Sequence, residues 1–549
     1  MFVKIFDNIG LTRLAQFSLN KGSTAVFGRR DVTTPAPRRL GIAHFSKVGT
    51  PTGFQTGKFY NIRILFERHA QKSSFFFLIV VLLFVNLYSL STLTTKPAYW
   101  YDEAMNVELA RNFADFGKLD LIVAPNTFSG QGALVGSTGY TVTVPLAGFF
   151  RVFGFGLKEA RIYMLLWMSA LIVFFFHIAK KLWGTNVAYF GTLLIATFAP
   201  FYGNGRSVMG EIPGFLFFLL SFYFLERRKW WQSGILLGLA VVSKPSIFIF
   251  LIPAYVLVVL LLHDVWKQRI TNLCKIGSGS LLALLPWLAI YAGEIKGGGL
   301  MEDILAHFKN PYAEAGLTTV ANISANIPTL VTSTTVLYLW AMLATVIFAL
   351  FLEQRFRWEY KNLLIIFSIY APFALLQYLK SFGYLRYLIA AELLTFILFL
   401  GALPCLFRWF LAKTRFSLGA STLSGLIVAL LVVVQTIHLF GFSDLYASEK
   451  TQKTIVHLYS TYPLGTIGII NVPQVASFVP SFQKYQYLST YGLSDFGTHM
   501  LYLAPERLPN VLVTESVQSV LSAEEQEFLD LRYERDDAFT EGFTVYRKR

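Results

Sequence analysis

Long apolar runs recur along the chain and are separated by short polar or basic segments. Four of these runs, 73–93, 162–179, 246–262 and 418–440, contain no Asp, Glu, Lys or Arg. An α-helix needs about 20 apolar residues to cross hydrocarbon roughly 30 Å thick, and a buried soluble helix rarely stays uncharged for so long. The pattern predicts an all-α polytopic membrane protein.

Extending this interpretation along the chain gives about eleven transmembrane helices. Turn residues and charged residues mark the ends of these helices. The only charged segment between the helices 212–225 and 232–244 is Glu226-Arg227-Arg228-Lys229. The predicted helices are 73–94, 162–179, 186–202, 212–225, 232–244, 246–262, 277–293, 331–352, 363–379, 388–407 and 418–440.

Composition supports this class of protein. Apolar residues make up 54% of the 549 positions and charged residues 14%, far from a soluble average. The net charge of +15 raises the possibility of nucleic-acid binding, but Lys and Arg fall in short clusters between apolar runs rather than on one face. Such clusters mark cytoplasmic loops. We therefore expect no nucleic-acid partner, a cell inner (plasma) membrane location, a cytoplasmic N-terminus and, from the odd helix count, an external C-terminus.

Three parts of the chain are expected. Residues 1–72 are basic and predict a disordered cytoplasmic tail, with an organelle transit segment as the alternative. Residues 73–440 form the transmembrane domain, with a large external loop at 95–161. Residues 441–549 turn soluble in composition and predict a small external α/β domain. Its expected strands are 467–471, 510–514 and 542–547, with a helix at 522–529.

An acidic pair, Asp102-Glu103, follows three aromatic residues just past the first span. At the membrane surface, the two carboxylates either take part in catalysis or have a structural role. In the structural alternative, the aromatic residues form an interfacial belt and the aspartate caps the helix that follows. The stretch 106–116 has an apolar helical face and predicts an interfacial helix beside the pair.

A second acidic position, Glu211, opens an apolar run in the external turn 205–213. An ionised side chain avoids such a run unless it faces a polar cavity or a partner. The alternative is a first-turn carboxylate favoured by the helix dipole and paired with Arg206.

Lys244 and Arg386 are predicted at external helix ends, where the positive-inside tendency disfavours them. Each of these cations, taken alone, is explained by a long side chain that extends its charged end to the membrane surface. Cations on the same side as three carboxylates also make a phosphate-binding site, with Arg offering bidentate contacts and Lys a point charge. Tyr387, beside Arg386, fits the same site.

The ordered set of these features resembles the GT-C class of integral membrane glycosyltransferases, among them protein O-mannosyltransferases and lipid A aminoarabinose transferases. The resemblance covers roughly residues 73 to 440. It rests on the acidic pair, the Arg-x-x-x-Gly-Glu turn 206–211, Lys244 and the Arg386-Tyr387 pair. The resemblance implies transfer of a sugar from a polyprenyl-phosphate donor to a protein, lipid or glycan acceptor on the external face, within a membrane.

Roles follow from the resemblance alone. Asp102 would be the general base of an inverting single displacement, and Glu103 would orient it or share the acceptor contact. Lys244 and Arg386, with Arg206 and Tyr387 as further candidates, would bind the departing phosphate. Glu211 would be the second acidic residue, and a divalent metal on Asp102 and Glu211 is optional, with no certain cofactor. Tyr101 and Tyr140 are candidates for acceptor or sugar contacts.

Two departures from the class stand out: the proline often found after the Arg-Tyr pair is missing, and Pro245 follows Lys244. The absence of large repeated external modules favours a bacterial or archaeal enzyme. A transporter or lipid flippase is the alternative, although such proteins usually show paired halves and charges deeper in the spans. An inert scaffold would leave the acidic pair without a purpose.

Overall fold

The structure is a computed structural model that describes residues 56–130, 138–262, 265–294, 319–381, 383–414, 418–445, 447–488, 507–515 and 523–549. The chain divides into two units, Met1–Ile79 and Val80–Arg549.

The first unit is described from residue 56, where helix α3 (Thr56–Ser91) begins. The predicted tail 1–72 therefore ends in helix over 56–72, and its first 55 residues lie outside the described part. Residues 59–72 contain neither Gly nor Pro, so a polar helix continues directly into the apolar one. The disordered cytoplasmic tail stays a prediction. The stretch Lys72–Ser91 is long and apolar enough to cross a membrane.

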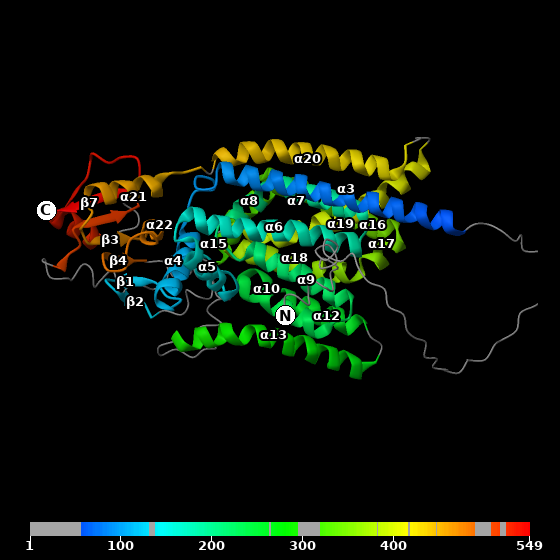
Figure 1. The fold of residues 1–549 in the computed structure, drawn as a ribbon, viewed down its shortest axis with the longest axis horizontal. Coiled ribbons are helices and arrows are strands. Elements are labelled where there is room, and N and C mark those ends of the chain that lie inside the picture. Colours follow the sequence, from blue (N-terminus) through cyan, green and yellow to red (C-terminus); the bar gives the residue numbers. More distant parts are fainter. Residues whose placement is uncertain are drawn as a thin grey trace, which may run out of the picture. The chain divides into compact units, whose positions relative to one another are not determined.

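The second unit is predominantly helical (Figure 1). Its helices before the C-terminal region are α4 (Tyr101–Phe116), α5 (Tyr140–Phe153), α6 (Leu157–Leu182), α7 (Thr185–Thr197), α8 (Ala199–Arg206), α9 (Glu211–Glu226), α10 (Trp230–Ser243), α11 (Pro245–Phe248), α12 (Leu251–Leu262), α13 (Trp266–Glu294), α15 (Thr319–Thr332), α16 (Thr334–Leu352), α17 (Gln354–Glu359), α18 (Lys361–Lys380), η3 (Leu385–Leu388), α19 (Ile389–Lys413) and α20 (Ala420–Leu445).

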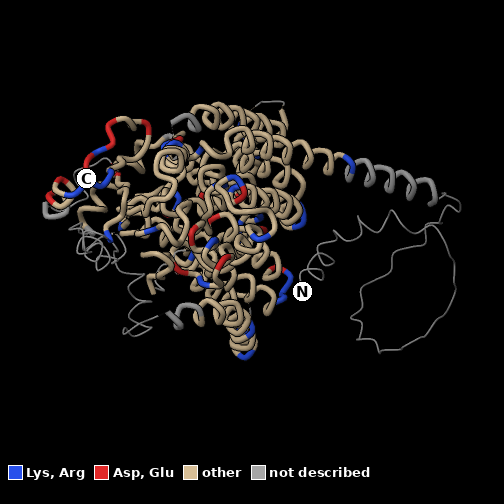
Figure 2. Tube along the Cα trace, turned by 60° about the vertical axis from the view of Figure 1, so that its left-hand side comes forward, with Lys and Arg blue, Asp and Glu red and all other residues tan. Residues whose placement is uncertain are grey.

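All eleven ranges predicted from hydrophobicity fall on helices. Within the described residues, six helical segments are long and apolar enough to span a membrane, or eight if each of two bent pairs is one span. The bent pairs are α8 with α9, at 106°, and Val320–Thr332 with Val336–Leu352, at 77°. The chain is thus a multi-pass membrane protein, while the number of eleven crossings stays a prediction. Figure 2 shows how few charged residues interrupt the helices.

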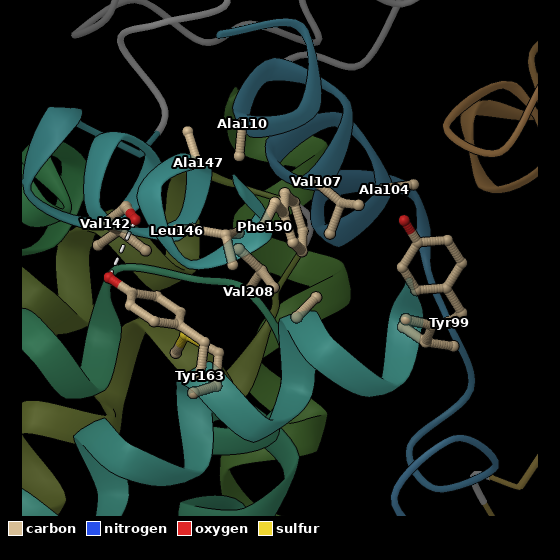
Figure 3. Packing of buried hydrophobic residues seen from close by; sticks show 13 residues of the cluster. Tyr99, Ala104, Val107, Ala110, Val142, Leu146, Ala147, Phe150, Tyr163 and Val208 are labelled. Carbon is tan, nitrogen blue, oxygen red and sulfur yellow. Dashed lines mark hydrogen bonds between the residues drawn. The ribbon is translucent and has the colours of Figure 1, made fainter. Parts of the chain in front are cut away.

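Helix α4 differs from the interfacial helix predicted over 106–116. Nine of its 16 residues are buried, including Glu103, Asn106, Glu108 and Asn112. Its apolar side packs with α5 and α6 around Val107, Leu146 and Tyr163 (Figure 3). The prediction of a helix at the lipid surface was wrong because α4 is buried within the protein and its polar side chains bind other segments.

The C-terminal region contains a five-stranded mixed sheet in the order β4-β3-β5-β7-β6. Its strands are β3 (Ile467–Ile470), β4 (Lys484–Tyr487), β5 (Val511–Thr514), β6 (Tyr533–Arg535) and β7 (Thr544–Lys548), and its helices are α21 (Lys450–Thr461), α22 (Pro473–Ala476) and α24 (Ala523–Arg532). Strand β3 pairs in parallel with β4 and β5, whereas β7 is antiparallel to β5 and β6.

Helices cover both faces of this sheet, and strands β3 and β5 are therefore apolar along their length instead of alternating with polar residues. Ile467 and Ile469 pack with residues of α21 and α22, and Leu512 packs with Leu529 of α24. The predicted α/β character is therefore confirmed, and the three predicted strands and the helix are present. Strands β4 and β6 were missed because neither contains an apolar run. The predicted boundaries near residues 72 and 440 stay predictions, and helices α3 and α20 cross them.

Candidate active site

Asp102 and Arg386 form the centre of the site. Arg386 Nη2 donates to Asp102 Oδ2 at 2.6 Å, with side-chain exposures of 8% and 22% respectively. Asp102 is the second residue of α4, and Arg386 lies in the short 3₁₀ helix η3 that leads into α19. Two residues that the sequence analysis assigned to one external surface are thus in direct contact.

Aromatic rings surround the Arg386 guanidinium. Its Cζ lies 4.3 Å from the Trp100 ring centroid, 4.8 Å from Tyr384 and 5.6 Å from Tyr387. Such cation–π contacts hold a planar guanidinium in one orientation. Within the described residues, Arg386 Nε and Nη1 are buried and have no hydrogen-bond partner. The side chain is therefore fixed in place with donors still available.

Glu211 and Lys244 belong to the same group of charges. Glu211 is the first residue of α9, and Lys244 directly follows α10. Gly210 brings the two chain segments together, because a Cβ there would lie 1.7 Å from the Ser243 carbonyl oxygen. Lys244 interacts electrostatically with Glu211, Arg386 and Asp102.

Glu211 is fully buried, and in the described part of the chain neither of its carboxylate oxygens has a hydrogen-bond partner. It interacts electrostatically with Lys244 and Arg386. A buried carboxylate without hydrogen bonds is costly. Two carboxylates and two cations thus share one buried site, and several of their polar atoms are left for a polar ligand.

Glu103 points elsewhere. Arg161 of α6 donates to both of its carboxylate oxygens, at 2.9 and 2.7 Å, and both side chains are fully buried. The remaining Arg161 nitrogen, Nη1, donates to the carbonyl oxygens of Leu93 and Pro97. Of the two predicted roles for Glu103, contact with an acceptor conflicts with this burial, whereas orientation of α4 agrees with it.

Arg206 lies in a second group. Its Nη1 donates to Thr92 Oγ1 at 2.8 Å, and its guanidinium lies 5.8 Å from the rings of Tyr88 and Tyr202. Its electrostatic neighbours are Arg161, Tyr88, Tyr202 and Glu103, and among the described residues they do not include Asp102 or Arg386. Trp100 connects the two groups, because its indole nitrogen donates to Ser207 Oγ at 3.3 Å.

The three candidate tyrosines lie in different surroundings. Tyr387 is nearly buried beside Arg386. Tyr101 packs with the apolar cluster of Met105 and Leu109 on α4. Tyr140 donates through its hydroxyl to the Ala283 carbonyl of α13 at 2.9 Å.

The segment before Arg386 has its own support, which the sequence analysis missed. Asn326 of α15 donates from Nδ2 to the carbonyl oxygens of Tyr378, Leu379 and Ser381, the last at 2.7 Å. Gly383 has φ +69°, and a Cβ there would lie 2.1 Å from Asn326 Oδ1. A single asparagine thus fixes the turn that presents Arg386. No sequence signal identifies it, since Asn326 lies between the predicted helices 277–293 and 331–352, in a stretch without a recognisable motif.

Metal ligation has little support in this geometry. The described residues include no group of three or more His, Cys, Asp or Glu side chains placed to hold a metal ion. Asp102 and Glu211, the two residues proposed from the sequence, share their site with two cations. The optional metal stays a prediction.

Similarity to known proteins is found in part of the sequence and throughout the fold. Residues 142–291 match the family model described as dolichyl-phosphate-mannose-protein mannosyltransferase. This segment includes Glu211 and Lys244. No curated protein matches the chain by sequence.

Among solved structures, ArnT from Cupriavidus metallidurans bound to undecaprenyl phosphate is similar, with a TM-score of 0.57 and 12% identity, over 87% of this chain and 98% of that chain. The apo state of the same ArnT gives a TM-score of 0.56 at 12% identity, with the same coverage. The oligosaccharyltransferase of Archaeoglobus fulgidus with Zn and sulfate gives 0.48 at 12% identity, over 85% of this chain and 72% of that chain. The similarity to ArnT shows that this chain has the expected GT-C fold.

Proposed function

We propose that this protein is a membrane glycosyltransferase that moves a sugar from a polyprenyl-phosphate donor to an acceptor hydroxyl. One observation carries the proposal: a partly exposed carboxylate, Asp102, is hydrogen-bonded to a buried guanidinium, Arg386, with Glu211 and Lys244 in the same group of charges. The likeness to ArnT bound to undecaprenyl phosphate and the family match over residues 142–291 support it.

Asp102 is the general base in this proposal. Its side chain is 22% exposed, so an acceptor can reach it, while the first turn of α4 is anchored by Glu103 through Arg161. The acceptor oxygen attacks the anomeric carbon as Asp102 takes its proton. The bond from that carbon to the phosphate oxygen breaks on the opposite side, so the configuration inverts.

Arg386 and Lys244 receive the leaving group. The departing polyprenyl phosphate keeps the electron pair of the broken bond, and cations at this point stabilise the charge as it develops. Arg386 Nε and Nη1 are donors without partners among the described residues, so a phosphate can bind there while Nη2 stays with Asp102. Tyr387 holds the guanidinium from the side.

A surface groove supports a lipid donor. It measures about 720 Å³ and lies between α16, α18 and α19. Its lining is apolar apart from Ser368, Glu392 and Thr395, and it includes Leu388, two residues after Arg386. An isoprenoid chain fits such a surface because it offers no hydrogen bonds, and burying it is favourable in proportion to its apolar area.

The remaining candidates take secondary roles. Glu211 is proposed to hold a sugar hydroxyl, because its oxygens are buried and unpaired among the described residues. Arg206, which binds Thr92, is proposed to support the fold beside the site rather than the phosphate. Tyr101 and Tyr140 keep their predicted contacts with acceptor or sugar as proposals. The site is proposed to face the external side of the inner membrane, with the basic clusters on the cytoplasmic side.

The test uses the purified full chain in proteoliposomes. Undecaprenyl-phosphate-linked mannose and aminoarabinose are supplied as labelled donors together with a membrane extract as the acceptor source. We expect release of undecaprenyl phosphate and transfer of label to an acceptor, and we expect Asp102→Asn to abolish both. Asp115→Asn, an exposed carboxylate at the other end of α4, is the matched control.

Mass spectrometry of cells with and without the protein completes the experiment, because it detects donors and acceptors beyond the two supplied. Unchanged lipid-linked sugars and glycans, with no release in proteoliposomes, would refute the proposal. Movement of an intact donor across the bilayer without loss of its sugar would instead establish the flippase.

A further inference from the structure

The C-terminal region contacts α4, the helix that carries Asp102, through buried polar groups. Lys484 Nζ of β4 donates to Glu108 Oε1 at 2.6 Å, and both side chains are almost completely buried. The same ammonium group donates to the Ala476 carbonyl at 3.1 Å. Lys484 therefore connects β4, the end of α22 and the middle of α4. Figure 1 shows these three elements close together.

Glu108 collects further donors. The Ile122 amide, in strand β1 (Ile122–Ala124), donates to Oε1 at 3.2 Å. The Gln486 side-chain amide also faces Glu108, and exchanging its oxygen and nitrogen lets the nitrogen donate to Oε2 at 3.1 Å. Burial lowers the pKa of the Lys484 ammonium group, and the adjacent Glu108 opposes that shift. A buried pair with this many hydrogen bonds has one defined geometry.

Arg111, one turn further along α4, contacts the same region. Its Nη1 donates to the carbonyl oxygens of Ser477 and Val479 at 2.9 and 3.1 Å, and its guanidinium lies 4.5 Å from the Phe155 ring. At the start of α4, the Tyr99 hydroxyl lies 3.0 Å from Ser477 Oγ. The turn after α22 thus contacts both the segment just before α4 and Arg111 within the helix.

Helix α4 is anchored on its other sides as well. Glu103 binds Arg161 of α6, and Asn106 Nδ2 donates to the Val208 carbonyl at 2.8 Å, three residues before Glu211. Asp102 lies six residues before Glu108, or about 9 Å along the helix axis. A helix held at these points tilts when one contact is lost, and its first turn moves relative to Arg386.

We propose that Glu108 and Lys484 are positioning residues, through which the C-terminal region fixes Asp102 against Arg386. This inference rests on the proposed function, in which Asp102 is the base. Displacements of about 1 Å cost roughly 100-fold in rate where two groups must be aligned. The Glu108–Lys484 pair then supports catalysis without touching the substrate.

The test compares a single variant with a double variant. Lys484→Met leaves Glu108 buried without its cation, which destabilises the protein. Lys484→Met combined with Glu108→Gln removes the unpaired charge, so thermal stability recovers. We expect kcat to fall by about 10-fold or more in both, with the donor KM within roughly 2-fold of the wild type. Lys453→Met, which breaks an exposed pair with Glu541 in the same region, is the control.

Hydrogen exchange across α4 provides a readout that needs no activity. We expect faster exchange of its amides in both Lys484 variants and no change in Lys453→Met. Recovery of kcat together with stability in the double variant would assign the pair a purely structural role, as would unchanged exchange in α4. If the wild type transfers no sugar, the proposed function fails, and the exchange data still decide whether β4 holds α4.

Discussion

Arg386 and Asp102 are 284 residues apart in the chain and share a 2.6 Å hydrogen bond. Helix α4, which carries Asp102, is held by α6 and the C-terminal region. Helix η3, which carries Arg386, follows the end of α18, and α15 holds that end through Asn326. The Asp102–Arg386 hydrogen bond therefore depends on the contacts that hold α4 and on those that hold the segment before Arg386. Substitutions can remove either set of contacts separately.

Arg386→Lys keeps the charge and removes the planar guanidinium. We expect binding of undecaprenyl phosphate to weaken by about 10-fold or more, since a charged hydrogen bond contributes about 1.5–3 kcal/mol. Thermophoresis with undecaprenyl phosphate in detergent measures the affinity. Arg408→Lys, at the opposite end of α19 and paired with Glu353, is the control and should bind as the wild type does. Equal affinities in both variants would exclude Arg386 from the phosphate site.

Glu211→Gln removes a buried charge without changing the shape of the side chain. We expect kcat to fall by about 10- to 100-fold while thermal stability changes little, because the desolvation cost of the carboxylate disappears but Lys244 loses a negative neighbour. Glu226→Gln, at the other end of α9 and hydrogen-bonded to Asn362, is the control. Loss of stability without loss of kcat would show that Glu211 serves the fold alone.

Gly383→Ala tests the turn that presents Arg386. A side chain at φ +69° costs about 1–2 kcal/mol, and its Cβ would collide with Asn326 Oδ1. We expect undecaprenyl phosphate to bind about 10-fold or more weakly, by the same assay. Gly441→Ala is the control, because a Cβ there would meet no atom within 4 Å. If Gly383→Ala binds undecaprenyl phosphate with wild-type affinity, the turn accommodates the added Cβ without moving Arg386.

Arg161→Met leaves Glu103 as an uncompensated buried charge. Breaking such a pair costs about 3 to 5 kcal/mol. We expect a clear drop in the thermal unfolding temperature, and recovery of much of that drop when Glu103→Gln is added. Arg535→Met, from an exposed pair with Asp537, should change the unfolding temperature little. An unchanged temperature in Arg161→Met would mean that water or another group satisfies Glu103.

The sequence was sufficient to place the helices and the four charged residues of the site. Hydrophobic runs locate the helices, and alternating basic clusters place Asp102, Glu211, Lys244 and Arg386 at the same ends. The structure brings these four residues into one group of charges, which agrees with that prediction. Hydrophobicity does not give the number of crossings, because α7 and α10 are too short to span hydrocarbon and α8 meets α9 at a bend of 106°.

The direction of each side chain was beyond the sequence. Asp102 and Glu103 are neighbours, but successive helical residues point about 100° apart, so one faces Arg386 and the other Arg161. The amphipathic pattern of 106–116 predicts an interfacial helix because the pattern does not show which groups its polar residues bind. Its polar residues bind protein groups from segments hundreds of positions away, such as Lys484.

The buried Glu108–Lys484 contact limits how this protein can be recombined with its structural relatives. A chimera that takes residues 441–549 from another enzyme would place a foreign side chain opposite Glu108, and the buried carboxylate would lose its cation. Helix α4 and strand β4 therefore have to be inherited together, and substitutions at positions 108 and 484 are expected to occur in pairs.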